Sequence, residues 1–259
     1  MTEHGQALHG QALLYVTHDR AGTSAVRSMG TADLGAGGVP VVLVPGLGAL
    51  GYLLRTLERC ARSGPARLLD VPGHRDPAGR VCGDTLGALA DTVARWLTDV
   101  PGGPVVLAGH STGAQVALHA AALRPGRVRS LVLMAPTFPP RLRRMGPLGA
   151  AAFHTAVQES PGVVPAVLPS YLAAGPRRLL ACARSAQADA PEEVLPRVTC
   201  PVTLVGAEDD VLSPPGWVRH LAGRAVRGRA VVVHGAHAFP HRYPDATAEA
   251  LNGVRDAPF

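Results

Sequence analysis

PVVLAGHSTGAQVALHAAALRPG (104–126) is the stretch of sequence that decides the fold. It begins as a short apolar run typical of a buried strand and continues as a helical pattern that Pro125-Gly126 ends. Between the two lies Gly109-His110-Ser111-Thr112-Gly113, which matches the pattern G-x-S-x-G in the strand-to-helix context of a nucleophile elbow. Because such a sharp turn lifts the serine hydroxyl clear of the sheet, we predict that Ser111 is a nucleophile.

The alternation of strands and helices extends on both sides of this stretch. An opening hairpin is predicted at residues 12–18 and 25–30. Further strands are predicted at 39–45, 66–72, 128–136, 200–206 and 229–235. Helices are predicted at 52–64, at 84–100 with Asp84 as N-cap, at 215–223 and from about Asp245. This order predicts an α/β fold with a mostly parallel central sheet and helices on both faces. Between 137 and 190 the alternation stops, and frequent proline and glycine favour only short helices. We therefore expect a core domain of residues 1–136 and 191–259, with a small helical cap insertion at 137–190.

A nucleophilic serine needs a histidine base, and the base needs an acid that fixes its tautomer. His237 is our candidate base because it follows the predicted strand 229–235, at an edge where α/β sheets build sites; His234 and His241 are near enough to be confused with it. Asp209 and Asp210 follow the strand 200–206, and only one of these neighbouring side chains can serve the histidine. The order serine, aspartate, histidine is the order of a nucleophile-elbow triad.

Composition excludes several other chemistries. The 259 residues carry a net charge of +6, and every basic residue is arginine, so no lysine is present for a Schiff base or a phosphate-binding loop. The four cysteines are scattered, which predicts reduced thiols and no metal site. No run of about 18 residues is apolar throughout, and the first residues do not resemble a secretory signal. We expect a cytoplasmic protein without cofactors, and we expect neither nucleic acid nor a membrane among its partners.

A competing interpretation comes from Gly46-Leu47-Gly48-Ala49-Leu50-Gly51, which follows a strand and precedes a helix. With Asp70 at the end of the next strand, it matches the fingerprint of an NAD(P)-binding oxidoreductase. That interpretation is disfavoured because it leaves the motifs around Ser111, Asp209 and His237 unexplained. A binding protein with an idle triad is a second alternative, which a serine-reactive fluorophosphonate probe would test.

Taken together, LVPGLG, LLDVPGH, GHSTG, GAEDDVLSP and GAHAF resemble the α/β-hydrolase superfamily over roughly residues 12–252. The resemblance implies the α/β-hydrolase fold and assigns the acid, three residues after the glycine that ends its strand, to Asp209. It also implies an oxyanion hole formed by the backbone N–H groups of Leu47 and Thr112. The sequence departs from the family at Pro45-Gly46, where His-Gly is usual, and at Gly73-His74-Arg75-Asp76-Pro77, so the substrate cannot be carried over.

The expected activity is serine-dependent hydrolysis of a small-molecule ester, thioester or lactone through an acyl-enzyme on Ser111. An acyltransferase or thioesterase-like enzyme that takes an acyl group from a carrier protein is the alternative. We expect the cap to govern substrate choice, and its arginines could dock an acidic carrier protein. Candidate substrate-binding residues are His110 in the elbow motif and, in the cap, Phe138, Met145, Phe153, Leu168 and Tyr171. Any of the five cap residues could instead hold the cap to the core.

Overall fold

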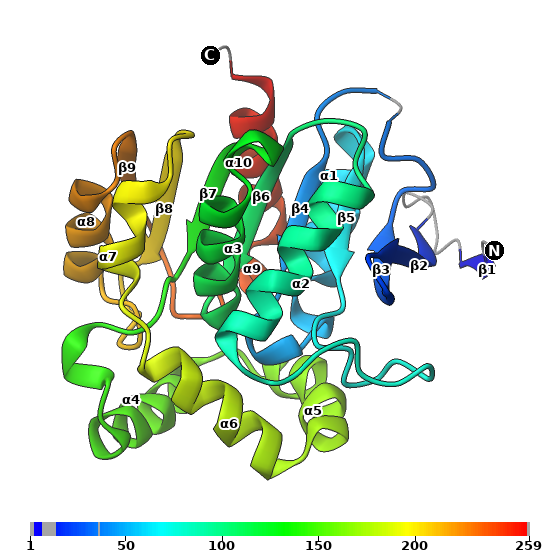
Figure 1. The fold of residues 1–259 in the computed structure, drawn as a ribbon. Helices are drawn as coiled ribbons and strands as arrows, with labels where there is room; N and C mark the ends of the chain where they lie inside the picture. The colour runs from blue at the N-terminus through cyan, green and yellow to red at the C-terminus, as the bar shows by residue number, and fades with distance from the viewer. Residues whose placement is uncertain (1–2, 7–13, 36, 258–259) are drawn as a thin grey trace.

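The computed structural model describes residues 3–6, 14–35 and 37–257. Within them, nine strands form one sheet in the order β1-β2-β3-β5-β4-β6-β7-β8-β9 (Figure 1). The strands β1, β2 and β3 are antiparallel to their neighbours in the sheet. The remaining strands, in the sheet order β5, β4, β6, β7, β8 and β9, pair in parallel. The strands are β1 (Glu3–Gln6), β2 (Leu14–Ala21), β3 (Ser24–Gly30), β4 (Val41–Val44), β5 (Ala66–Leu69), β6 (Val105–His110), β7 (Val128–Met134), β8 (Val202–Ala207) and β9 (Gly228–Val233).

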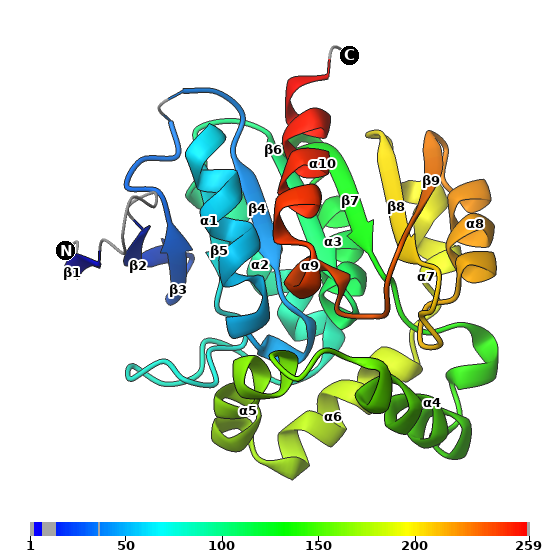
Figure 2. The same ribbon diagram turned by 180° about the vertical axis from the view of Figure 1, so that it is seen from behind.

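Helices cover both faces of the parallel strands, as Figures 1 and 2 show from opposite sides. One face carries α2 (Leu86–Asp99), α3 (Thr112–Leu123) and α8 (Pro215–Arg224), and the other carries α1 (Leu54–Ser63) and α10 (Pro244–Asp256). Strands β4, β6 and β8 are buried along their whole length, which explains why they consist mostly of Val, Leu and Ala. The predicted fold class, an α/β-hydrolase fold with a mostly parallel sheet, is confirmed.

The N-terminal hairpin is confirmed as β2 and β3, whose register pairs Tyr15 with Gly30. The N-cap of α2 differs from the prediction by one residue. Thr85, not Asp84, is the capping residue, and its hydroxyl accepts a hydrogen bond from the Ala88 N–H. Asp84 forms an ion pair with Arg80 in the preceding loop, so its carboxylate is directed away from the helix.

Between β7 and β8, the helices α4 (Met145–Gln158), α5 (Val163–Ala174) and α6 (Pro176–Gln187) extend across the carboxyl ends of the strands, and the short α7 (Pro191–Val194) follows them (Figures 1 and 2). The prediction that prolines allow only short helices here is wrong. Pro147, Pro165 and Pro176 lie in first turns, where a missing N–H loses no bond within the helix. Pro169 lies beyond the first turn, in the interior of α5. We call residues 137–190 the cap segment.

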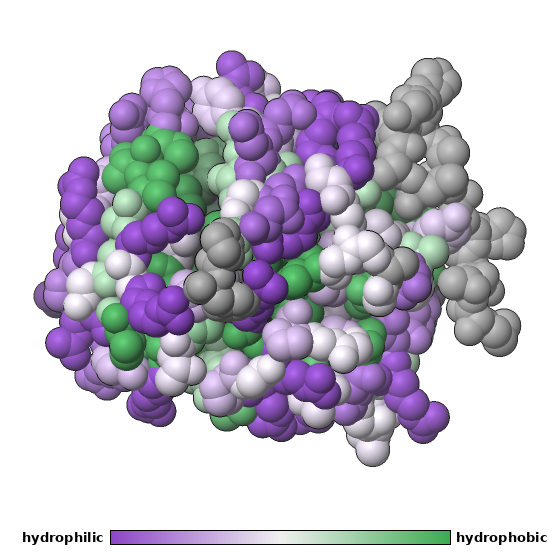
Figure 3. Space-filling model, turned by 90° about the horizontal axis from the view of Figure 1, so that it is seen from above, coloured by the Kyte–Doolittle hydropathy of each residue, from purple (hydrophilic) through white to green (hydrophobic). Residues whose placement is uncertain are grey.

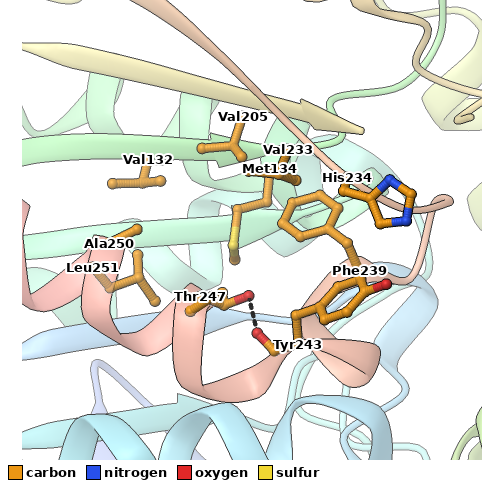
Figure 4. A pocket seen from close by; sticks show the side chains of 11 residues that line it. Val132, Met134, Val205, Val233, His234, Phe239, Tyr243, Thr247, Ala250 and Leu251 are labelled. Carbon is orange, nitrogen blue, oxygen red and sulfur yellow. Dashed lines mark hydrogen bonds between the residues drawn. The ribbon is translucent and has the colours of Figure 1, made fainter. Parts of the chain in front are cut away.

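The C-terminal helix α10 leaves a gap against β7, β8 and β9. A cavity of about 240 Å³ lies there, and its lining is almost wholly apolar (Figure 4). Tyr243 and Thr247 also line it, and the Thr247 hydroxyl donates a hydrogen bond to the Tyr243 carbonyl.

Seen from the end opposite the cap segment, the molecule shows an apolar patch on the side that carries β8, β9 and α8 (Figure 3). None of the described helices is both long and apolar enough to cross a membrane.

Candidate active site

Ser111 is the single residue between the end of β6 and the start of α3. Its backbone has φ 58° and ψ −126°, a strained conformation for a residue with a side chain. The glycines on either side permit this turn: a Cβ at Gly109 would lie 2.2 Å from the carbonyl oxygen of Gly113, and one at Gly113 would lie 2.4 Å from that of Val44. The spacing G-x-S-x-G is therefore required by close backbone contacts.

The structure brings His237 to the serine. His237 lies in the loop after β9, and its Nε2 is 2.9 Å from Ser111 Oγ. The distance suits a hydrogen bond that the hydroxyl donates to the ring. His234, considered above as an alternative, lies 3.2 Å from Glu208 at the surface, and His241 lies near the Tyr52 carbonyl. Of these three histidines, His237 is therefore the one placed to take the serine proton.

The expectation that Asp209 holds the histidine is wrong. Asp210 does so, since its Oδ2 is 2.8 Å from His237 Nδ1 and its side chain is fully buried. The other oxygen, Oδ1, accepts hydrogen bonds from the N–H groups of Leu212 and Ser213, so the carboxylate is fixed from both sides. Asp209 is exposed. The physical reason is that β8 extends to Ala207, one residue beyond the expected glycine, so the turn that carries the acid starts one residue later.

Burial and charge act in opposite directions on this pair. Burial by itself raises the pKa of Asp210, but the His237 ring and two backbone N–H groups outweigh it and hold that pKa below its ordinary value. Burial lowers the pKa of His237, but the carboxylates of Asp210 and Glu159 outweigh it, so the pKa is raised. The arrangement thus favours an imidazole that takes up a proton while the acid beside it stays ionised.

The loop after β4 lies against the serine. A Cβ at Gly46 would be only 3.0 Å from the Cβ of Ser111, so this loop passes directly beside the nucleophile. Leu47 has φ 47°, and its N–H donates to the Thr112 hydroxyl at 2.8 Å. Thr112 begins α3, so its own N–H has no acceptor within the helix. The structure therefore places the two residues expected to form an oxyanion hole in contact, with the Leu47 N–H held by a side chain.

His110, expected to bind substrate, is 3% exposed and is instead part of a buried hydrogen-bond network. The Gly46 N–H donates to the Tyr52 hydroxyl at 2.8 Å, and that hydroxyl is 2.9 Å from His110 Nδ1. On the other side of the ring, Nε2 is 2.9 Å from the carbonyl oxygen of His237. Because a carbonyl only accepts, Nε2 carries the proton and Tyr52 donates to Nδ1. The network ties the loop at Gly46 to the loop that carries the base.

Burial lowers the pKa of His110 to about 3, and the neighbouring His237 adds to this effect. His110 is therefore neutral over the working range of most proteins and keeps one tautomer. Burial likewise raises the pKa of Tyr52, so its hydroxyl stays protonated as a donor. Each hydrogen bond of this network therefore has one fixed donor and one fixed acceptor.

We expect Tyr52→Phe to lower kcat about tenfold with little change in KM, because small displacements of reacting groups are costly. The substitution removes the bridge and leaves the Gly46 N–H and His110 Nδ1 without their partner. Steady-state kinetics on any ester that the protein hydrolyses would measure the effect. Tyr15→Phe in β2 is the matched control and should leave kcat unchanged. A kcat for Tyr52→Phe equal to that of the control would contradict a positioning role for the network.

Glu159, at the end of α4, is the point at which the cap segment contacts the base loop. Its Oε1 accepts a hydrogen bond from the Ala238 N–H at 2.6 Å, directly after His237. Burial raises the pKa of Glu159, and its carboxylate in turn raises the pKa of His237. A cavity of about 470 Å³ opens beside this contact, lined in part by Asp209 and Arg242. The cap segment therefore supplies a second carboxylate near the base.

The remaining residues expected to bind substrate do not gather around Ser111. Met145, Phe153 and Leu168 are 48%, 74% and 45% exposed, and no described contact joins them to the triad, so their part in substrate binding stays a prediction. Phe138 is buried in a cluster with Leu142, Leu148 and Ala186, where it packs the cap segment together. Tyr171 packs against the core cluster that contains Tyr52, and burial raises its pKa to about 12. The alternative that these residues hold the cap in place fits Phe138 and Tyr171.

The geometry also bears on the dinucleotide interpretation. The glycines from Gly46 to Gly51 form two short 3-10 turns, Gly46–Gly48 and Gly51–Leu53, instead of opening a helix at the strand end. Asp70 is 1% exposed and accepts a hydrogen bond from Arg27 Nε at 2.7 Å. An acid paired in this way is not free to bind a ribose hydroxyl. The glycines and Asp70 of the fingerprint thus form turns and an ion pair within the fold.

A family model described as alpha/beta hydrolase family matches residues 41–250. The chain belongs to the alpha/beta hydrolase family. The matched residues include the elbow at Ser111, the acid loop at Asp210 and the base loop at His237, which are the three segments joined by hydrogen bonds.

Among curated proteins, the chain is 28% identical over 227 residues to a pimeloyl-[acyl-carrier protein] methyl ester esterase of Neisseria meningitidis, covering 76% of this chain and 85% of that protein. It is 39% identical over 102 residues to the dihydrolipoyllysine-residue acetyltransferase component of an acetoin cleaving system of Pseudomonas putida. That match covers 39% of this chain and only 28% of the length of that protein. Among solved structures, a thermophilic esterase from Thermogutta terrifontis is similar in fold, with a TM-score of 0.70, 23% identity and coverage of 93% of this chain and 98% of that one.

Tyr52 and Glu159 are the site residues that the sequence analysis missed. Tyr52 carries no local signal, because its partners lie at positions 46 and 110 and meet it only in the folded chain. Glu159 had a signal that could have been used: the cap segment contains only two acidic residues, Glu159 and Asp189. An isolated acid in an arginine-rich segment suggests a specific internal partner.

Proposed function

We propose that this protein is a serine esterase that hydrolyses carboxylic esters through an acyl-enzyme on Ser111. The observation that carries the proposal is the continuous chain of hydrogen bonds from Ser111 through His237 to Asp210. Such a chain supplies a nucleophile, a base and a group that fixes the tautomer of the base, and this combination activates an otherwise weak nucleophile.

In the acylation half, Ser111 Oγ attacks the ester carbonyl carbon while its proton passes to His237 Nε2. The carbonyl oxygen becomes an oxyanion, for which we assign the backbone N–H groups of Thr112 and Leu47 as donors, the Leu47 N–H exchanging its bond to the Thr112 hydroxyl for one to the oxyanion. Asp210 stays ionised and stabilises the imidazolium. When the C–O bond to the alcohol breaks, His237 returns its proton to the leaving oxygen, and an acyl group remains on Ser111.

In the deacylation half, water attacks the acyl carbon and loses a proton to His237 Nε2. The second tetrahedral intermediate uses the same oxyanion donors. Its collapse breaks the bond to Ser111 Oγ, which regains the proton from His237, and the carboxylic acid leaves. The free serine is restored, so the cycle consumes one ester and one water and needs no further reactant.

Hydrolysis of an ester is favoured over thioester or lactone hydrolysis and over acyl transfer by the relative matched along most of its length. That protein is named as a methyl ester esterase, whereas the match to an acetyltransferase component covers only 28% of its length. Intact mass spectrometry after incubation with a panel of acyl esters and thioesters would test the choice. Transient acylation at Ser111 and release of free acid support the proposal, and label transfer to an added amine or thiol in preference to water would favour acyl transfer.

Activity should rise with pH as His237 loses its proton, at a pH above the ordinary histidine value of about 6.5. Burial acts to lower the pKa of His237, but Asp210 and Glu159 raise it further than burial lowers it. Glu159→Gln keeps an oxygen for the Ala238 N–H and removes the negative charge, so the acidic limb of the kcat/KM profile should move to lower pH. Glu208→Gln, beside the exposed His234, is the control and should leave the limb in place. A limb that stays unmoved in Glu159→Gln would remove that carboxylate from the control of the base.

A further inference from the structure

The outward faces of α4 and α5 are rows of exposed apolar side chains that no described part of the chain covers. On α5, Val164, Leu168 and Leu172 recur every fourth residue and are 56%, 45% and 72% exposed. On α4, Phe153 and Val157 show the same spacing and are 74% and 72% exposed. Residues four apart lie on one face of a helix, so each helix presents a continuous apolar stripe. We call these five side chains the apolar stripes of the cap.

Both helices lie at the end of the molecule opposite the C-terminus, outside the carboxyl ends of the strands (Figures 1 and 2). Each has a separate, inward face that packs on the protein, carrying Leu148 and Thr155 on α4 and Ser170 and Ala174 on α5. The apolar stripes therefore do not serve as the contact between the cap segment and the core. Exposed apolar surface of this extent marks a site of interaction.

The exposed charges of the cap segment itself are basic. The cap segment contains six arginines and two acids. Both acids are engaged on the inner side: Glu159 accepts the Ala238 N–H, and Asp189 accepts bonds from Gln115 and His119. Arg144 directly precedes α4, Arg177 follows α5 by three residues, and both are exposed. The outer surface of the cap segment is thus apolar and cationic.

We propose that the outer face of α4 and α5 binds a lipid surface that carries anionic headgroups. An amphipathic helix with apolar side chains on one face and arginines at its margin lies in the interface of a bilayer, where the apolar groups enter the acyl region and the cations meet the headgroups. An acidic carrier protein would satisfy the arginines, but it would leave five large apolar side chains on two helices to be covered by a polar surface.

This proposal replaces the expectation that no membrane is a partner, which was argued only from the lack of a spanning segment. Surface binding needs no span, because helices of 12 to 14 residues lie in the interface instead of crossing it. Lipid binding also does not depend on the triad. It can be measured on a Ser111→Ala protein, so its failure and the failure of the proposed esterase activity are separate results.

Flotation of the Ser111→Ala protein with lipid vesicles tests the proposal. The probe is a vesicle of equal parts phosphatidylglycerol and phosphatidylcholine, compared with phosphatidylcholine alone. We expect binding to the anionic vesicle that weakens in 0.5 M salt. The double substitution Phe153→Ser with Leu172→Ser should lower the partition coefficient at least tenfold. Arg144→Glu with Arg177→Glu should do the same at low salt and remove the preference for phosphatidylglycerol, since each basic residue near an anionic surface contributes roughly tenfold or somewhat less.

The matched control is Val226→Ser with Arg227→Glu, an exposed apolar and basic pair between α8 and β9. It should change vesicle binding by less than about twofold, which would place the binding surface on the cap segment. Absence of flotation with anionic vesicles, or an equal loss in the control, would overturn the proposal. It would also be overturned if a purified acidic carrier protein bound through the apolar stripes and arginines while vesicles did not bind.

Discussion

Replacing Ser111 with alanine should lower kcat at least 10³-fold, on the order seen when a triad member is lost, while the fold stays intact. The expected size follows from the geometry of the elbow. Ser111 Oγ is the atom that meets His237 Nε2, and the strained backbone at φ 58° presents it there. Removing the hydroxyl leaves the base, the acid and the loop at Gly46 in place but removes the atom that forms the bond to the acyl group.

The measurement needs proof of folding beside the rate. Circular dichroism and the thermal midpoint of Ser111→Ala should match those of the parent protein, since no described contact other than that with His237 depends on Oγ. Ser63→Ala, at the exposed end of α1, is a matched control that should retain full activity. Retention of more than a tenth of the parent activity by Ser111→Ala would remove this serine from the mechanism.

The second large effect is expected at Asp210. Asp210→Asn should lower kcat about 10³- to 10⁴-fold, because an amide in this position can hold the imidazole in the wrong tautomer. The residue next to it provides the control: Asp209→Asn changes an exposed carboxylate and should stay within about twofold of the parent. The two variants carry the same change, from a carboxylate to an amide, at neighbouring positions in the chain.

Steady-state kinetics of the two variants would separate them directly. Asp210 also holds the turn at Leu212 and Ser213, so the stability of Asp210→Asn must be measured by denaturant unfolding at the same time. The Asn side-chain oxygen can still accept those two N–H groups, so we expect the variant to keep its fold. Equal losses in Asp209→Asn and Asp210→Asn would contradict the assignment.

The elbow could be predicted from sequence because its requirements are local. A strand, two glycines, a serine and a helix follow one another within about twenty residues, and each glycine is fixed by a contact to the neighbouring backbone. The sheet was also predictable, since buried parallel strands read as continuous apolar runs. His237 followed from its place after a strand.

The acid could not be fixed to one residue because its position depends on where β8 ends. Sequence periodicity locates strand boundaries only within a few residues, and a shift of one residue exchanges Asp209 for Asp210. Pairing of Ala207 with Val233 in β9 extends the strand past the expected glycine. That contact joins positions 26 residues apart, so no local pattern reports it.

The orientation of the cap helices could not be predicted for a different reason. Met145, Phe153 and Leu168 were expected near the substrate because a cap over the site would supply apolar residues to the pocket. On α4 and α5 the covered face carries mostly small or polar residues such as Thr155 and Ser170, and large apolar side chains lie on the uncovered face. Helical spacing shows which residues share a face, but it does not say which face is turned inward.

The buried link between Tyr52 and His110 has a consequence for sequence variation among relatives. Each of the two side chains satisfies the other, so replacing one alone leaves a buried polar atom without its partner, and replacing the second then breaks no further bond between the two. The free energies of the two substitutions should therefore not add. In an evolutionary record the two positions are expected to change together or not at all, although 58 positions separate them in the chain.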